Sequence, residues 1–137
     1  MNRTAIVAAM FCLVLCACSK APSDGKIEQQ VVATLTAGGA DKLYDVENFR
    51  KTNGLQKDDK TYEAQIHYEI VFKKAIDEFM RKMDANPMQP AGGLGAAYMV
   101  IGKALAQGAR IAPGQRVPVD ESVTLLKTDN GWQVAGQ

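Results

Sequence analysis

The sequence predicts an α+β domain in which a helix packs on a curled antiparallel sheet of about four strands, with a Gly- and Met-rich helical insert. Three observations predict it. Apolar residues recur at every fourth position between Ile27 and Leu35, which is typical of one helix face. They occupy every second position between Tyr62 and Phe72, as in a strand with one buried face. Near the end, short alternating segments flank a typical hairpin turn, Thr128-Asp129-Asn130-Gly131.

The first 17 residues have the pattern of a signal peptide. A single charge, Arg3, precedes an uncharged apolar run from Ala5 to Ala17. A membrane-spanning helix needs about 20 apolar residues, so this run is too short to be a permanent anchor. A buried N-terminal helix is the alternative, and the linker-like stretch 19–25 that follows at once argues against it.

All three cysteines lie in or next to this run, at positions 12, 16 and 18. The segment Leu15-Cys16-Ala17-Cys18 resembles the lipobox of bacterial lipoproteins, although Cys16 departs from the small or β-branched residue that is usual there. The resemblance implies export, cleavage before Cys18, diacylglycerol on its sulfur and an acyl chain such as palmitate on its amino group. Two or more acyl chains anchor a protein stably. In that family an Asp after the cysteine commonly retains the protein in the inner membrane, so Ser19 favours the outer membrane, with the domain facing the periplasm.

The chain from Cys18 onward contains 15 basic and 15 acidic residues, because Arg3 is the only charged residue before it. This zero net charge argues against nucleic acid as a partner, since binding by counterion release needs a basic face. Residues 18–23 form the lipidated end and a tether that spans at most ~18 Å. We therefore expect residues 24–137 to form one periplasmic domain close to its membrane.

The domain is expected to begin with a helix at about 25–37. Ser23 or Asp24 can cap its first turn, because both side chains accept hydrogen bonds from free backbone N–H groups. Gly38-Gly39 is expected to end it.

Two strands are expected next. The first lies at about 43–52, and its imperfect alternation allows a bulge. The polar stretch 51–60 contains a turn signal, Asn53-Gly54. The second strand is the clearest in the chain and covers 62–72.

The second half of the chain starts with helical patterns. One helix is expected at 74–84, a flexible Pro/Gly/Ala loop at 85–96, and a second helix up to about residue 107. Strands at 117–125 and 132–134 close the chain.

This order of elements, together with the closing segment LLKTDNGWQV at 125–134, resembles the small α+β cone folds called cystatin-like or nuclear-transport-factor-like, which many exported lipoproteins of unassigned role share. The resemblance implies a ligand pocket between helix and sheet, which Tyr62, Tyr68 and Trp132 would line. In the isomerase members an inward carboxylate and a Tyr hydroxyl do the chemistry. Glu121 is the carboxylate with inward parity on the third strand and, if buried, could be a general base. The alternative is a bulge or bend at Asp120-Glu121 that turns both residues toward water.

Two further patterns invite a metal hypothesis. His67 has Glu63 and Glu69 on the same strand face, where a divalent ion could bind, but closed sites need three or four convergent ligands. Met80 and Met83 have a spacing that occurs in copper sites. We favour a polar outer face for His67 and core packing for the two methionines, and we expect no metal.

The insert suggests a protein partner instead. Met88, Leu94, Tyr98 and Met99 could form a soft apolar surface. The chain has no P-loop, no GxSxG motif and no paired catalytic Cys and His, so we expect no enzyme, no catalytic residues and no cofactor besides the covalent lipid. The expected function is a membrane-anchored accessory protein that binds another envelope protein through its sheet face or through the insert. The alternatives are a binder of small apolar ligands in the cone interior and an inhibitor of a periplasmic enzyme. An inhibitor needs a protruding loop, which 51–60 or 85–96 could form.

Overall fold

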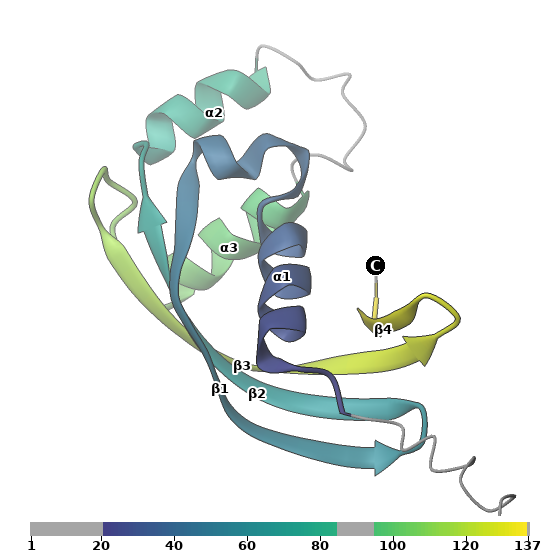
Figure 1. Cartoon of the computed structure of the whole chain (residues 1–137). Coiled ribbons are helices and arrows are strands. Elements are labelled where there is room, and N and C mark those ends of the chain that lie inside the picture. The colour runs from purple at the N-terminus through teal and green to yellow at the C-terminus, as the bar shows by residue number, and fades with distance from the viewer. Residues whose placement is uncertain (1–20, 85–94, 137) are drawn as a thin grey trace, which may run out of the picture.

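A four-stranded antiparallel sheet in the order β1-β2-β3-β4 organises the molecule (Figure 1). The computed structural model describes residues 21–84 and 95–136, so the predicted signal, Cys18 and most of the 85–96 loop lie outside the described residues. The strands are β1 Tyr44–Asp58, β2 Thr61–Phe72, β3 Arg116–Thr128 and β4 Gly131–Val134. Helices combined with a sheet of four antiparallel strands confirm the predicted α+β class.

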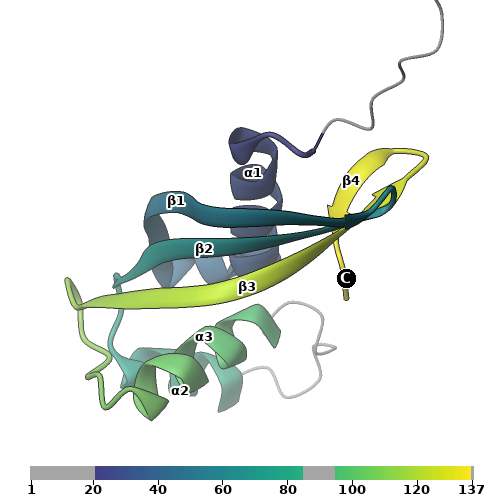
Figure 2. The same cartoon turned by 90° about the horizontal axis from the view of Figure 1, so that it is seen from below.

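The sheet curls around the helices, and its other face carries none of the described helices (Figures 1 and 2). The helical segments are α1 Asp24–Leu35, the 3-10 segment η1 Ala37–Lys42, α2 Ile76–Asp84 and α3 Gly95–Ala106. Ser23 caps α1 by accepting a hydrogen bond from the Lys26 N–H at 3.3 Å. Gly38 and Gly39 follow α1 with φ of 66° and 88°, a conformation that glycine adopts without steric cost.

The strand β1 is longer than predicted, and the expectation of a turn at Asn53-Gly54 was wrong. Both residues lie inside β1, where Gly54 pairs with Ala64. A Cβ at Gly54 would lie 1.9 Å from the Tyr62 hydroxyl oxygen, so the glycine makes room for a ring that crosses the strand. The turn that joins β1 to β2 lies at 59–60. The polar stretch is therefore mostly strand rather than a protruding loop.

Strand β1 also contains bulges, which its imperfect alternation in the sequence allowed but did not locate. Its pairing with β2 shifts between Glu47 and Arg50, where Asn48 adopts a left-handed conformation with φ of 52°. A second shift lies between Lys51 and Asn53. Bulges of this kind increase the local twist and bend an edge strand.

The predicted alternation of β2 is confirmed, since every second residue from Tyr62 to Phe72 is buried. These side chains meet the buried residues of the helices and of β3, which are Ile27, Val31, Leu35, Ala97, Val100, Ile101, Ala104, Val117, Val119 and Leu125.

Within residues 21–84 and 95–136, no helix is both long enough and apolar enough to cross a membrane.

The expectation that Met80 packs in the core was wrong, because its side chain is 48% exposed. Strand β2 ends at Phe72, and α2 lies beyond that end of the sheet (Figure 1). Among the side chains of α2 that the structure describes, Ile76 at its start packs against the core. The side chain of Met83 lies outside the described residues.

Candidate functional site

Glu121 lies at the margin of the core and joins two other elements. It pairs with Ile66 in a ladder that shows no register shift, so β3 has no bulge there. The Tyr68 hydroxyl donates a hydrogen bond to Glu121 Oε1 at 2.7 Å, and Lys103 of α3 forms an ion pair with Oε2. Tyr68 is fully buried, and Glu121 is 23% exposed. This contact connects β2, β3 and α3.

The electrostatics of this contact favour a structural role. Burial raises the pKa of Tyr68 well above its usual value, and the hydrogen bond to Glu121 raises it further. Tyr68 is therefore a neutral donor at ordinary pH. Each carboxylate oxygen of Glu121 has a partner in the protein, so the contact holds this side chain against β2 and α3.

The aromatic residues expected to line a pocket are packed in the core. Tyr62 and Trp132 are 6% and 7% exposed and meet edge to face, with 6.2 Å between ring centroids. Tyr68 stacks on Phe49 at 6.5 Å. The side chains of Tyr62, Tyr68 and Trp132 therefore fill the space between the helices and the sheet. None of them lines the hollow on the surface of the sheet.

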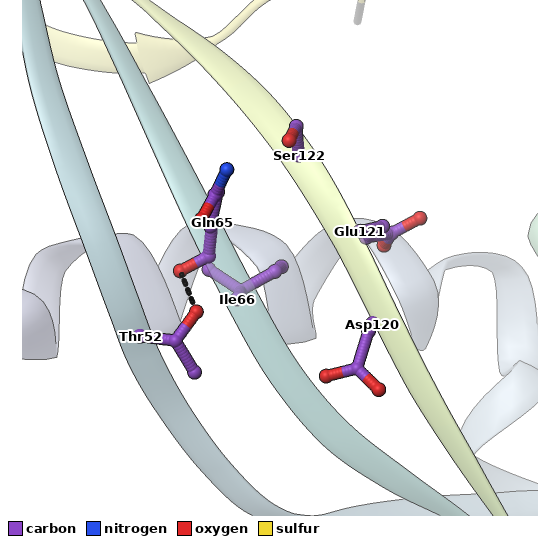
Figure 3. Close-up of a pocket in the computed structure, with 6 residues that line it drawn as sticks. All are labelled: Thr52, Gln65, Ile66, Asp120, Glu121 and Ser122. Atoms are coloured by element: carbon purple, nitrogen blue, oxygen red, sulfur yellow. Dashed lines mark hydrogen bonds between the residues drawn. The ribbon is translucent and has the colours of Figure 1, made fainter.

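A hollow of about 330 Å³ lies across the three long strands (Figure 3). It is lined by Thr52, Gln65, Ile66, Asp120, Glu121 and Ser122. Figure 3 views the sheet with the helices behind the strands, so the exposed side chains of Gln65, Asp120 and Ser122 lie on the face opposite the helices. Thr52 enters through the second bulge of β1, and its hydroxyl donates to the Gln65 carbonyl at 3.2 Å. Groups of this kind can hydrogen-bond a polar ligand or a partner backbone.

Sequence reasoning missed this hollow, because its residues have the pattern of an ordinary solvent-exposed strand face. The bulge that brings in Thr52 has no signal in the local sequence beyond the imperfect alternation of β1. Of the lining residues, Glu121 is the one that the sequence had singled out.

His67 lies on the same outer face of β2 as Glu63 and Glu69, as expected, but its partner comes from another strand. His67 Nδ1 lies 2.8 Å from Asp120 Oδ1 on the adjacent strand, whereas Glu63 pairs with Lys57. Glu69 binds Arg116 and accepts a hydrogen bond from Asn48, and these contacts hold its pKa below the usual value, with Arg116 the larger cause. Cross-strand neighbours lie closer than residues two positions apart on one strand, which explains the difference.

Metal-binding clusters are also absent from residues 21–84 and 95–136. Within these ranges no three His, Cys, Asp or Glu side chains lie together in a way that could hold an ion.

The outer face of α3 is the strongest candidate for contact with another molecule. Its buried residues follow one helical stripe, Ala96 and Lys103 are half-buried, and the remaining six residues are exposed. Tyr98, Met99 and Leu105 are 49%, 58% and 50% exposed. Two residues of the expected partner surface, Met88 and Leu94, lie outside the described residues. We call the exposed residues of α3 the α3 outer face, and they are Gly95, Tyr98, Met99, Gly102, Leu105 and Ala106.

The chain was compared with protein-family models, curated proteins and solved structures, and none of them matches it.

Proposed function

We propose that this protein is an exported lipoprotein, held at the periplasmic side of the outer membrane by lipid on Cys18, that acts without catalysis by binding another envelope protein. The signal pattern of residues 1–17 and the likeness of the next residues to a lipobox support the anchor. The likeness to cone-shaped lipoprotein domains, with a first helix on the sheet, belongs to the same proposal. The observation that carries the binding role is the exposed apolar side of α3.

The α3 outer face is unusual for a surface helix. Such helices normally present charged and polar residues to water, and a helix that is apolar on all sides is normally buried. None of the six residues of the α3 outer face carries a charge. Exposed patches of this kind mark interaction sites.

The position of the chain's start favours a protein rather than the lipid surface as the partner. The described chain begins beside the first turn of α1, on the opposite side of the domain from α3 (Figure 2). A short tether from Cys18 therefore holds the α1 side near the membrane and directs the α3 outer face away from it, where another envelope protein can reach it.

Photo-crosslinking in living cells tests the binding role. A photoreactive phenylalanine analogue replaces Met99 or Leu105 in the full-length protein, and a control carries it at Leu126, which is 43% exposed on β3. We expect one discrete adduct from positions 99 and 105 and none of that mass from position 126. Mass spectrometry then identifies the partner. Purified partner should bind the unmodified protein, and Tyr98→Ser should weaken that binding about tenfold or more.

Two results would reject the binding role. One is the absence of any adduct from positions 99 and 105 at normal protein levels, and the other is the same adducts from position 126. The anchor has a separate test, in which Cys18→Ala abolishes incorporation of labelled fatty acid and Cys16→Ala does not. Labelling that persists in Cys18→Ala contradicts the proposed anchor.

A further inference from the structure

A glycine in the middle of the α3 outer face indicates which kind of partner the face fits. Gly102 lies one turn from Tyr98 on one side and one turn from Leu105 on the other, and all three are exposed. A Cβ built on Gly102 would meet no atom within 4 Å. Its φ is not positive, unlike that of six other glycines in the chain. The fold therefore has both the space and the backbone conformation for a larger residue at this position.

The glycine is unfavourable for the domain itself. In a helix interior, glycine is less stable than every common residue except proline, because it has the most conformational freedom to lose. Nothing in the described structure compensates for this loss at position 102. A glycine on a surface has one other physical consequence, which is that another backbone can approach it closely because no Cβ stands between them.

We infer that the partner of the α3 outer face contributes an α-helix that crosses α3 at Gly102. This inference rests on the proposed function, since it concerns the same surface. Packed helices lie about 8–10 Å apart, depending on the side chains at the crossing point, and a glycine there permits the short end of that range. In this arrangement the side chains of Tyr98 and Met99 on one side of Gly102, and of Leu105 on the other, would be the two walls of a shallow saddle for the partner helix.

The charge of the surface defines the chemistry of the partner helix. The one charged residue of α3, Lys103, is paired with Glu121 beside the core. A charged residue on the contacting side of the partner would lose its hydration without finding an opposite charge on the α3 outer face. The contacting side of the partner helix is therefore apolar or small.

A second copy of this chain does not fit the surface when both copies are anchored. Two copies that meet through the same surface are related by a two-fold axis in their interface. Any part of the protein that lies on the side away from α3 is then at opposite ends of the dimer in the two copies. The chain start lies on the far side from α3 (Figure 2), so short tethers could not reach one membrane.

The test uses one substitution that the fold tolerates and the contact does not. Gly102→Leu fills the saddle, while Ala33→Leu adds the same side chain to an exposed position of α1 and is the matched control. Both variants carry the photoreactive residue at position 105 in full-length protein. We expect Gly102→Leu to keep or raise the melting temperature, by up to about 4 °C, and to lower the yield of the adduct at least about tenfold. Ala33→Leu should leave the yield unchanged.

The mapped crosslink gives the second readout. The partner residue joined to position 105 should lie on an α-helix whose contacting side has no charge. An adduct that forms equally in Gly102→Leu, or a crosslink to a strand or loop, overturns the helix while leaving the proposed function intact. An adduct with the mass of two copies of this chain overturns it as well. The absence of any adduct from the unsubstituted protein rejects the proposed function itself.

Discussion

The helices α1 and α3 have the same length, lie on the same side of the sheet and bury one apolar stripe each, yet their exposed sides differ. The exposed side of α1 includes Asp24, Glu28 and Gln29, as expected for a helix that faces water. The six residues of the α3 outer face carry no charge. Folding alone explains α1, because one side packs and the other is hydrated. The uncharged outer side of α3 fits the proposed function, in which that side contacts another protein.

The two helices should depend equally on their buried sides. Ile27 of α1 and Ile101 of α3 are 0% and 7% exposed. Replacing either with Ala removes buried atoms and leaves a cavity, which costs about 2–5 kcal/mol of unfolding free energy. Urea denaturation of both variants measures the cost. A loss below about 1 kcal/mol for Ile101→Ala alone would mean that α3 is not packed on the core as α1 is.

Some elements of this core could be predicted from the sequence, and others could not. The alternation of β2 and the hairpin at Thr128–Gly131 depend on patterns within a few residues, so they were predicted correctly. Asn53-Gly54 has the same local appearance as a turn, but its role depends on Tyr62, which packs across it from the next strand. Contacts between distant segments decided the outcome there.

The candidate sites also differ in whether they depend on local patterns or on contacts between distant segments. The inward parity of Glu121 could be counted along its strand, and the exposed Tyr98 and Met99 were singled out from composition. The partnership of Glu121 with Lys103 depends on where α3 lies against β3, and no pattern along the chain specifies that position. The hollow on the opposite face requires a bulge that places Thr52 beside Gln65.

Each helix is also fixed by a buried tyrosine, which predicts sensitivity to alkali. Tyr44 donates a hydrogen bond to the carbonyl of Leu35 in α1 at 2.6 Å, and Tyr68 contacts Glu121 beside α3. Burial raises the pKa of both hydroxyls well above the usual value of about 10. Their contribution to stability is complete below pH ~10 and is lost as the pH rises further, because the unfolded chain then releases protons that the folded chain holds.

We therefore expect the unfolding free energy to fall by up to about 1.4 kcal/mol per pH unit for each tyrosine above pH ~10. Urea denaturation at pH 9, 10 and 11 measures the slope. Tyr44→Phe and Tyr68→Phe should each remove one of the two contributions. A slope that neither substitution reduces would contradict the role of buried hydroxyls in fixing the two helices.

A smaller effect distinguishes the two tyrosine contacts. The acceptor in α1 is a backbone carbonyl that no substitution removes, whereas the acceptor beside α3 is the side chain of Glu121. Glu121→Ala leaves the Tyr68 hydroxyl buried without an acceptor, which costs about 1–3 kcal/mol. Tyr68→Phe in the same background should recover part of that loss. Lys103→Met should cost no more than about 1 kcal/mol, because Lys103 is 41% exposed and water screens the ion pair. Thermal unfolding of the three variants separates these contributions.

The smallest predicted effect compares a glycine in each helix. A Cβ at Gly25 or at Gly102 would meet no atom within 4 Å. Gly102 lies in the interior of α3, where replacement by Ala should raise the unfolding free energy by about 0.5–1 kcal/mol. Gly25 lies in the first turn of α1, where the backbone N–H groups have no partner within the helix. Gly25→Ala should therefore gain less. Differential scanning calorimetry of both variants tests this order. A gain at Gly25 that equals or exceeds the gain at Gly102 would remove the reason for assigning the α3 glycine to a contact outside the fold.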